Sequence, residues 1–168
     1  YKLGLGQRTG VEVSEAQGRL TTKNDKNYTA SLDVQAAIGQ GNTVVSPVQL
    51  ATYAATLANN GVRYRTHFVK AILDSNTGEV LQETKPEVMD VIEDNGTTFE
   101  LVRQGMSQVA STISGKISSY PIAIACKTGT PQRSETYASG KHYLNAMMIA
   151  YLPADDPQIA IGISIEYG

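Results

Sequence analysis

The sequence predicts an α/β protein of the α+β type, in which an antiparallel sheet is flanked by helices. Three apolar runs close the chain, at about 122–130, 143–152 and 158–166, and each has the length of a strand. The Pro-Ala-Asp-Asp-Pro segment at 153–157 can only form a tight turn, so the last two strands must be antiparallel. Two earlier segments with the apolar spacing of a helix supply the flanking helices.

The composition is that of an ordinary globular domain. Of the 168 residues, 41% are hydrophobic and 18% are charged, which suits a single domain with a sizeable core. The net charge of −2 and the lack of a basic stripe argue against nucleic acid as a partner. The apolar runs are too short to span a bilayer. The single cysteine excludes an intrachain disulfide, and the two histidines show no metal-ligand spacing with it, so we expect neither a metal site nor a cofactor.

The N-terminal part is expected to be mostly loop until a helix begins after Ser46. Residues 6–33 are polar and rich in Gly, Thr, Asn and Lys. Ser46 is a suitable N-cap, Pro47 suits the first helical position, and Gln49 completes a capping box. Asn-Gly at 60–61 is a stop signal, so we predict a helix between these two points.

A hairpin and a second helix are predicted next. The apolar runs 68–73 and 79–81 flank Asp-Ser-Asn-Thr-Gly at 74–78, whose glycine can adopt a positive φ. A stretch at about 98–110 has apolar residues on one face and is preceded by Thr97, which can form a capping box with the glutamate three residues later.

The last predicted strand has two unlike faces. Its bulky and small residues alternate: Ile159, Ile161, Ile163 and Ile165 on one face, and Ala160, Gly162 and Ser164 on the other. The face of small residues lets a helix approach the sheet closely.

The most informative stretch is Ala-Cys-Lys-Thr-Gly-Thr at 125–130, at the end of a predicted buried strand. The ammonium group of Lys127 supplies positive charge, and the hydroxyls of Thr128 and Thr130 can donate to carboxylate oxygens. Gly129 allows a ligand to lie against the backbone. The pattern therefore predicts an anion-binding strand edge.

Cys126 is a candidate nucleophile by residue type, but its position favours a packing role. In a strand it alternates with Lys127, so we expect it to point to the opposite, protected face together with Ile122 and Ile124.

Other polar residues near the motif are interpreted as surface or turn residues. His142 follows the motif and is expected to be a surface imidazole, as is His67. The Tyr-bearing segment 135–140 is an ordinary loop or, alternatively, lines a cleft beside the motif. Asp155 and Asp156 belong to the predicted turn and are not a catalytic pair.

Three blocks give the chain a resemblance to the transpeptidase domain of penicillin-binding proteins, especially the monofunctional class B type. Gly-Gln-Gly at 39–41 and Val-Ser-Pro-Val-Gln-Leu-Ala at 45–51 resemble that family's Gly-Gln-Gly segment and the helix after it. Residues 125–130 resemble its third motif, Lys-Thr-Gly, and residues 151–166 resemble its two closing strands. Residues 3–10 also fit the passage after the second motif.

The resemblance covers only part of that domain. No serine in the chain is followed by Lys at the third position, so the nucleophile motif Ser-x-x-Lys is missing, and so is the Ser-x-Asn triplet. The helix expected after the last strand is missing too, and Cys126 stands where the family often has Gly. We therefore expect residues 1–168 to be the C-terminal portion of a single transpeptidase domain whose nucleophile-bearing half lies upstream.

The chemistry that the resemblance implies is acyl transfer. In the family a serine attacks the D-Ala-D-Ala end of a peptidoglycan stem peptide, D-Ala leaves, and an amine of a second stem resolves the acyl-enzyme. Lys127 and Thr130 would be the catalytic residues of this portion: Lys127 would hold the substrate carboxylate and influence proton transfer, and the N–H of Thr130 would be an oxyanion donor. Thr128 and Gly129 would bind substrate with them, as an added strand along this edge.

The same resemblance implies partners, location and rivals. The implied partners are stem peptides and β-lactam antibiotics, and the implied location is the extracytoplasmic face of the bacterial cytoplasmic membrane. A serine β-lactamase or β-lactam sensor and a non-catalytic peptide-binding module are the alternatives.

In the fold, we expect the 122–130 strand at a sheet edge beside the 143–152 strand. Apolar faces should lie exposed there, covered in the whole protein by the missing half of the domain or by a second copy.

Overall fold

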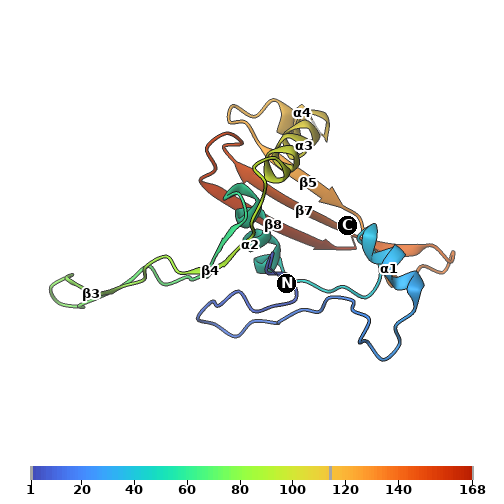
Figure 1. Cartoon of the computed structure of the whole chain (residues 1–168), viewed down its shortest axis with the longest axis horizontal. Coiled ribbons are helices and arrows are strands. Elements are labelled where there is room, and N and C mark those ends of the chain that lie inside the picture. The colour runs from blue at the N-terminus through green and yellow to red at the C-terminus, as the bar shows by residue number, and fades with distance from the viewer. Residues whose placement is uncertain (1, 114, 168) are drawn as a thin grey trace.

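The computed structural model describes residues 2–113 and 115–167, without the side chain of Ser134. Its centre is an antiparallel sheet built around the long strand β7, His142–Leu152 (Figure 1). Strand β8, Ile159–Glu166, pairs along one side of β7. Strands β5, Ala125–Gly129, and β6, Gln132–Thr136, follow one another along its other side. The predicted antiparallel sheet is therefore confirmed, with the motif strand at one edge beside β7.

Helix α2, Pro47–Ala58, crosses the face of small residues on β8. A Cβ atom added at Gly162 would lie 2.4 Å from the Pro47 carbonyl oxygen and 2.5 Å from the Ala51 nitrogen, so the helix backbone rests directly on the strand. The predicted capping box is present: Ser46 accepts from the Gln49 N–H, and the Gln49 side chain accepts from the Ser46 N–H. Both the helix and its close approach were predicted from local signals.

Gln49 has a second role because its side chain is fully buried. Its Nε2 donates to the carbonyl oxygens of Gln7 and Gln17, at 2.6 Å for the second. These bonds attach the N-terminal loop to the helix, and they satisfy an amide that would otherwise be costly to bury.

Helix α3, Thr98–Ile113, lies beside β5 and contributes to a core on each face of the sheet. The core toward α2 consists of Leu57, Ala58, Phe99, Met106, Ala125 and Tyr151. The smaller core on the other face consists of Ala110, Cys126 and Ala150, and Ile117 of the short helix α4, Gly115–Ser118, packs at its margin. Because Ala125 and Cys126 belong to different cores, the start of β5 is buried from both sides.

The N-terminus of α3 differs from the prediction. Thr97 donates its hydroxyl to Asn95 Oδ1 at 2.8 Å instead of forming a capping box. The carboxylate of Asp94 takes over, accepting from the Phe99 N–H at 3.2 Å and from Thr98. The bond from the Thr98 side chain, followed by the backbone N–H bonds, lowers the pKa of Asp94.

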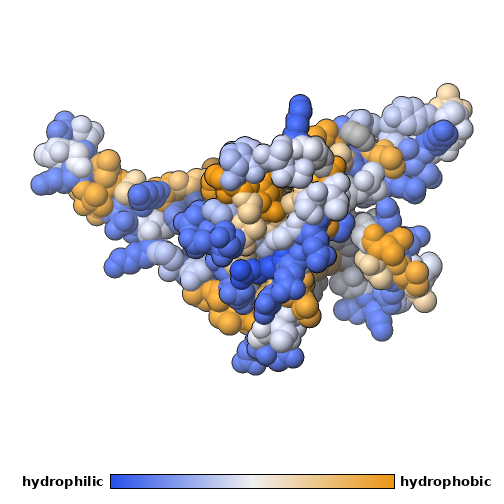
Figure 2. All heavy atoms as spheres, turned by 90° about the horizontal axis from the view of Figure 1, so that it is seen from above, coloured by the Kyte–Doolittle hydropathy of each residue, from blue (hydrophilic) through white to orange (hydrophobic). Residues whose placement is uncertain are grey.

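A long arm projects from the body (Figures 1 and 2). Its outer part is the predicted hairpin, now seen as β2, Ala71–Leu73, paired with β3, Val80–Glu83. Its inner part pairs β1, Val62–Tyr64, with β4, Val88–Val91, which the sequence analysis did not predict. Apolar residues lie among polar ones along the arm, and Phe68, Ile72, Leu73, Val80 and Leu81 are exposed there.

Three expectations about the remaining segments need correction. Helix α1, Ala30–Ala37, begins inside the segment predicted to be loop and has no buried residue. Strand β6 extends into the segment 135–140, whose first two residues were interpreted as loop. The motif strand begins at Ala125 rather than near 122, and Ile122 is 41% exposed instead of pointing into the protected face. Ile124 does pack against the smaller core, as expected.

Apolar surface is exposed on the face of β8 that turns away from α2. Ile159 and Ile165 are 56% and 55% exposed. Nearby, a mostly apolar pocket of about 240 Å³ lies between β5, β7, β8 and the end of α4, bordered by Ile117, Tyr120, Cys126, Met148 and Ile161. Apolar surface is thus exposed, but at the β8 edge of the sheet, whereas the expectation placed it beside the motif strand.

Candidate active-site strand

Strand β5 leaves an open edge whose backbone groups can be identified from the register. Gly129 pairs with Met147, and Asn145 donates to the Pro131 carbonyl oxygen at 3.0 Å, so the odd-numbered residues direct their backbone groups toward β7. By alternation, the N–H and C=O groups of Thr128 and Thr130 point to the open edge. An extended peptide can pair with such groups as an added strand.

The four motif residues lie together at the exposed end of this strand. Lys127, Thr128, Gly129 and Thr130 are all exposed, whereas Ala125 and Cys126 just before them are fully buried. The Lys127 ammonium donates to the Thr128 carbonyl oxygen at 2.6 Å, so its charge is held close to the strand. The structure therefore brings the predicted site residues together at the exposed end of one strand.

Gly129 stands in open space. A Cβ atom added there would meet only the Met147 Cβ at 3.9 Å, an ordinary contact, and its φ is not positive. Nothing in the described fold therefore requires glycine at this position. The space in front of the strand is available to a ligand.

Cys126 occupies the protected face, as predicted. Its side chain is fully buried beside Ala110 and Ala150. Burial raises the pKa of the thiol, and the nearby charge of Lys127 lowers it by less. A buried thiol held in its neutral form is a poor nucleophile, so a packing role fits this residue.

Sequence reasoning assigned no role to Gln40, which the structure places against the end of the motif. Its side chain accepts from the Gln132 N–H at 3.1 Å and donates to the Thr130 carbonyl oxygen at 3.5 Å. Gln40 lies between Gly39 and Gly41, whose φ angles are 75° and 93°. Two glycines around one long polar side chain are the only local sign of this contact.

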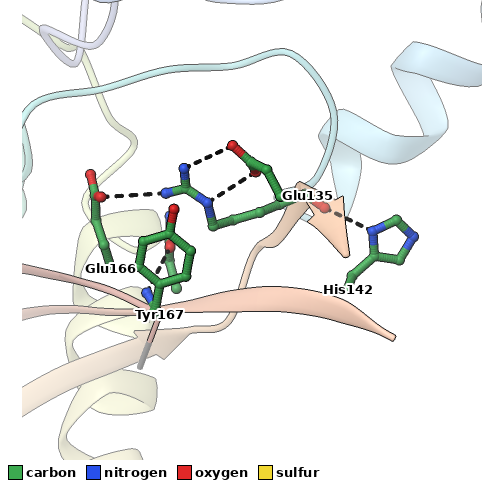
Figure 3. A network of polar contacts seen from close by, with 6 residues as sticks. Glu135, His142, Glu166 and Tyr167 are labelled. Carbon is green, nitrogen blue, oxygen red and sulfur yellow. Dashed lines mark hydrogen bonds and ion pairs between the residues drawn. The ribbon is translucent and has the colours of Figure 1, made fainter. Parts of the chain in front are cut away.

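A polar and aromatic network beyond the motif joins β6 to the end of β8 (Figure 3). Arg133 pairs with Glu135 at 3.1 Å and with Glu166 at 3.5 Å, and its guanidinium lies 4.5 Å from the centre of the Tyr167 ring. The pKa of Arg133 is raised, chiefly by the hydrogen bond to Glu135. His142 Nδ1 bonds to the Arg133 carbonyl oxygen at 2.8 Å, so this exposed imidazole closes the β6–β7 hairpin.

The other singled-out residues have the surface roles expected for them. Tyr137 is 48% exposed and packs on Tyr143, with ring centres 3.7 Å apart. His67 is half-buried, and its Nδ1 bonds to the Val69 carbonyl oxygen at 3.1 Å. Asp155 and Asp156 are exposed residues of the bend between β7 and β8.

In residues 2–113 and 115–167, no group of three or more His, Cys, Asp or Glu side chains is placed to hold a metal ion. No helix in them combines the length and the apolar character needed to cross a membrane.

Relatives in sequence match nearly the whole chain. The chain is 33% identical to penicillin-binding protein 2A of Bacillus subtilis, over 99% of this chain and 24% of that protein. It is 31% identical to the peptidoglycan D,D-transpeptidase MrdA of Acinetobacter baumannii, over 99% of this chain and 27% of that protein. The chain thus spans about a quarter of the length of these relatives.

Solved structures agree in fold. Penicillin-binding protein 2B of Streptococcus pneumoniae superposes with a TM-score of 0.85 at 31% identity, over 99% of this chain and 28% of that one. Penicillin-binding protein A of M. tuberculosis, solved as a ceftriaxone acyl-enzyme, gives 0.82 at 22% identity, over 99% of this chain and 36% of that one. The fold is that of penicillin-binding proteins and serine β-lactamases. The family model of the penicillin-binding protein transpeptidase domain matches residues 1–168, and the chain belongs to this family.

Proposed function

We propose that this chain is the C-terminal portion of a class B peptidoglycan D,D-transpeptidase domain. It supplies the strand along which the substrate lies while it acylates the serine. The observation that carries the proposal is the open edge of β5, which ends in the exposed sequence Lys127 to Thr130. The nucleophilic serine and the second motif belong to a part of the protein upstream of residue 1.

In this reaction the stem peptide lies along β5 with its terminal carboxylate at Lys127. The ammonium of Lys127 and the hydroxyls of Thr128 and Thr130 hold the carboxylate. The Thr130 N–H, which the register directs to the open edge, donates to the oxyanion that forms when the serine attacks the peptide carbonyl. D-Ala leaves with a proton, and an amine of a second stem takes over the acyl group.

β-Lactams are proposed to acylate the same serine, with their carboxylate held by the same residues. The family description and the exposed Lys-Thr-Gly sequence support this step. Such an enzyme works on the extracytoplasmic face of the cytoplasmic membrane, because its substrate is the cell wall. The exposed apolar face around Ile159 and Ile165 is then covered by the rest of the domain, or by a second copy of the chain.

Acylation of the intact parent protein by a fluorescent penicillin tests the proposal. Lys127→Ala should lower the second-order rate constant by about 30- to 1000-fold, because a charge-assisted contact in the transition state contributes roughly 2–4 kcal/mol. The exposed Lys127 adds little packing, so the thermal unfolding temperature should stay unchanged. Lys141→Ala removes another exposed lysine near the same end of the sheet and should leave acylation unchanged.

The product distinguishes the proposed enzyme from its rivals. A transpeptidase should release D-Ala from a stem pentapeptide analogue and hold the penicillin as a long-lived adduct. Rapid release of hydrolysed penicillin would instead indicate a β-lactamase. An intact parent that binds stem peptide but forms no adduct would indicate a peptide-binding module.

A further inference from the structure

Gln40 lies in the loop after α1, and its side chain forms hydrogen bonds to the end of the motif strand. The segment follows α1, whose residues are mostly exposed, including Val34 at 69% and Ile38 just beyond it at 74%. Within the described residues, α1 packs against no other helix or strand. The side chain of Gln40, by contrast, is half-buried and forms hydrogen bonds to Thr130 and Gln132.

The two bonds of Gln40 have the pattern of strand pairing. The Thr130 C=O and the Gln132 N–H flank Pro131, and both point to the open edge, whereas the Pro131 carbonyl points to β7. A neighbouring parallel strand would use the same two groups. The carboxamide of Gln40 therefore takes the place of a strand residue immediately beyond the motif, and the open edge of β5 ends at Thr130.

Thr130 gains support from these bonds because one ladder bond is missing beside it. The β5–β7 register ends with the Gly129–Met147 pair, and β6 begins only at Gln132. Pro131 between them has no N–H to donate to β7. The Gln40 bonds hold the peptide group after Thr130, and they thereby restrict the φ and ψ angles of that residue.

We infer that Gln40 is a positioning residue for acyl transfer, an inference that rests on the proposed function. It acts through Thr130: by fixing the backbone of this residue, it directs the Thr130 N–H at the oxyanion. It also closes the end of the substrate-binding edge, so that a peptide on β5 cannot continue past Thr130. Gln40 itself makes no contact with the reacting atoms.

The test uses acylation of the intact parent protein by a fluorescent penicillin, with binding and acylation rates separated by varying its concentration. Gln40→Ala should lower the acylation rate constant by about ten- to a hundredfold, since a displacement of about 1 Å in a catalytic group has effects of this size. The dissociation constant of the initial complex should change little, because Lys127 and the hydroxyls remain. Gln35→Ala is the matched control, since among the described residues the side chain of this α1 glutamine forms no hydrogen bond to the motif.

Gln40→Glu adds a readout that a purely structural role would not give. An ionised carboxylate can accept from the Gln132 N–H but has no proton to donate to the Thr130 carbonyl, whereas a protonated carboxyl can do both. The acylation rate of this variant relative to wild type should therefore rise as pH falls toward the carboxyl pKa of about 4–5. The same ratio for Gln35→Ala should stay flat.

The outcomes separate this inference from the proposed function. If the wild-type parent is not acylated at all, the proposed function fails. If the wild type is acylated, and at neutral pH Gln40→Ala and Gln40→Glu are both acylated as fast as the wild type, the positioning role is refuted. If Gln40→Ala lowers the unfolding temperature, Gln40→Glu decides: a ratio that does not change with pH, together with a slower rate, would show a structural role only.

Discussion

Gly162→Ala is the substitution whose effect follows most directly from the structure. The added Cβ would lie 2.4 Å from the Pro47 carbonyl oxygen, 2.5 Å from the Ala51 nitrogen and 2.8 Å from the Leu50 Cβ. Two of these three atoms are helix backbone, which cannot rotate away. To restore ordinary contact, α2 must move off β8 by about 1 Å. Such overpacking costs about 1–3 kcal/mol.

The expected result is a lower thermal unfolding temperature for this domain of the intact protein. At about 2–4 °C per kcal/mol for a domain of this size, the shift should be about 2–12 °C. Gly129→Ala is the matched control, because its Cβ would meet only Met147 at 3.9 Å and should leave the unfolding temperature unchanged. Equal unfolding temperatures for wild type and Gly162→Ala would refute the close contact between α2 and β8.

Three further predictions concern stability and labelling. Asp90→Ala should destabilise the protein by about 1–3 kcal/mol in chemical denaturation, because it leaves the buried Arg63, 3% exposed, without its ion-pair partner at 2.9 Å; an unchanged midpoint would show that Arg63 finds another acceptor. Asp94 has a lowered pKa in the folded state, so its contribution to stability is present above the unfolded pKa of about 4 and is lost as pH falls through the folded pKa. Asp94→Asn should therefore flatten the acid limb of a curve of stability against pH, and an unaltered limb would contradict the capping role of Asp94. Residues 1–168 alone should form no denaturation-resistant adduct with fluorescent penicillin, because Ser-x-x-Lys is missing; a labelled serine within this range would overturn the assignment.

The parts of the fold that could be predicted are those with local signals. Ser46, Pro47 and Gln49 specify the start of α2 through their own backbone and side-chain bonds, and the structure has all of these contacts. The alternation around Gly162 predicts a close helix, because only one face of the strand lacks bulky side chains. The Asp-Ser-Asn-Thr-Gly turn predicts the hairpin of the arm through another local signal, because its glycine adopts a φ of 73°.

The parts that were missed depend on contacts distant in sequence. Strand β6 forms because β7 continues past the end of β5, which residues 132–136 do not reveal by themselves. Helix α1 has no buried residue, so its sequence lacks the apolar face that would predict a helix. The contact of Gln40 with Thr130 spans 90 positions, and a single polar side chain carries it. Of the candidate site, the sequence therefore predicts the motif and its edge position, but not the residue that closes its end.

The alternation of β5 also bears on where the nucleophile must come from. Cys126 is the motif's own candidate, yet it faces the core with a raised pKa, while Lys127 faces the solvent on the opposite side. A twist that exposed the thiol would bury the ammonium, because successive side chains of a strand point to opposite faces. The strand can therefore present either the cationic binding group or the thiol at the open side, but not both. The exposed group is Lys127. In the proposed function this strand therefore holds the acyl donor, and the attacking serine comes from a different element.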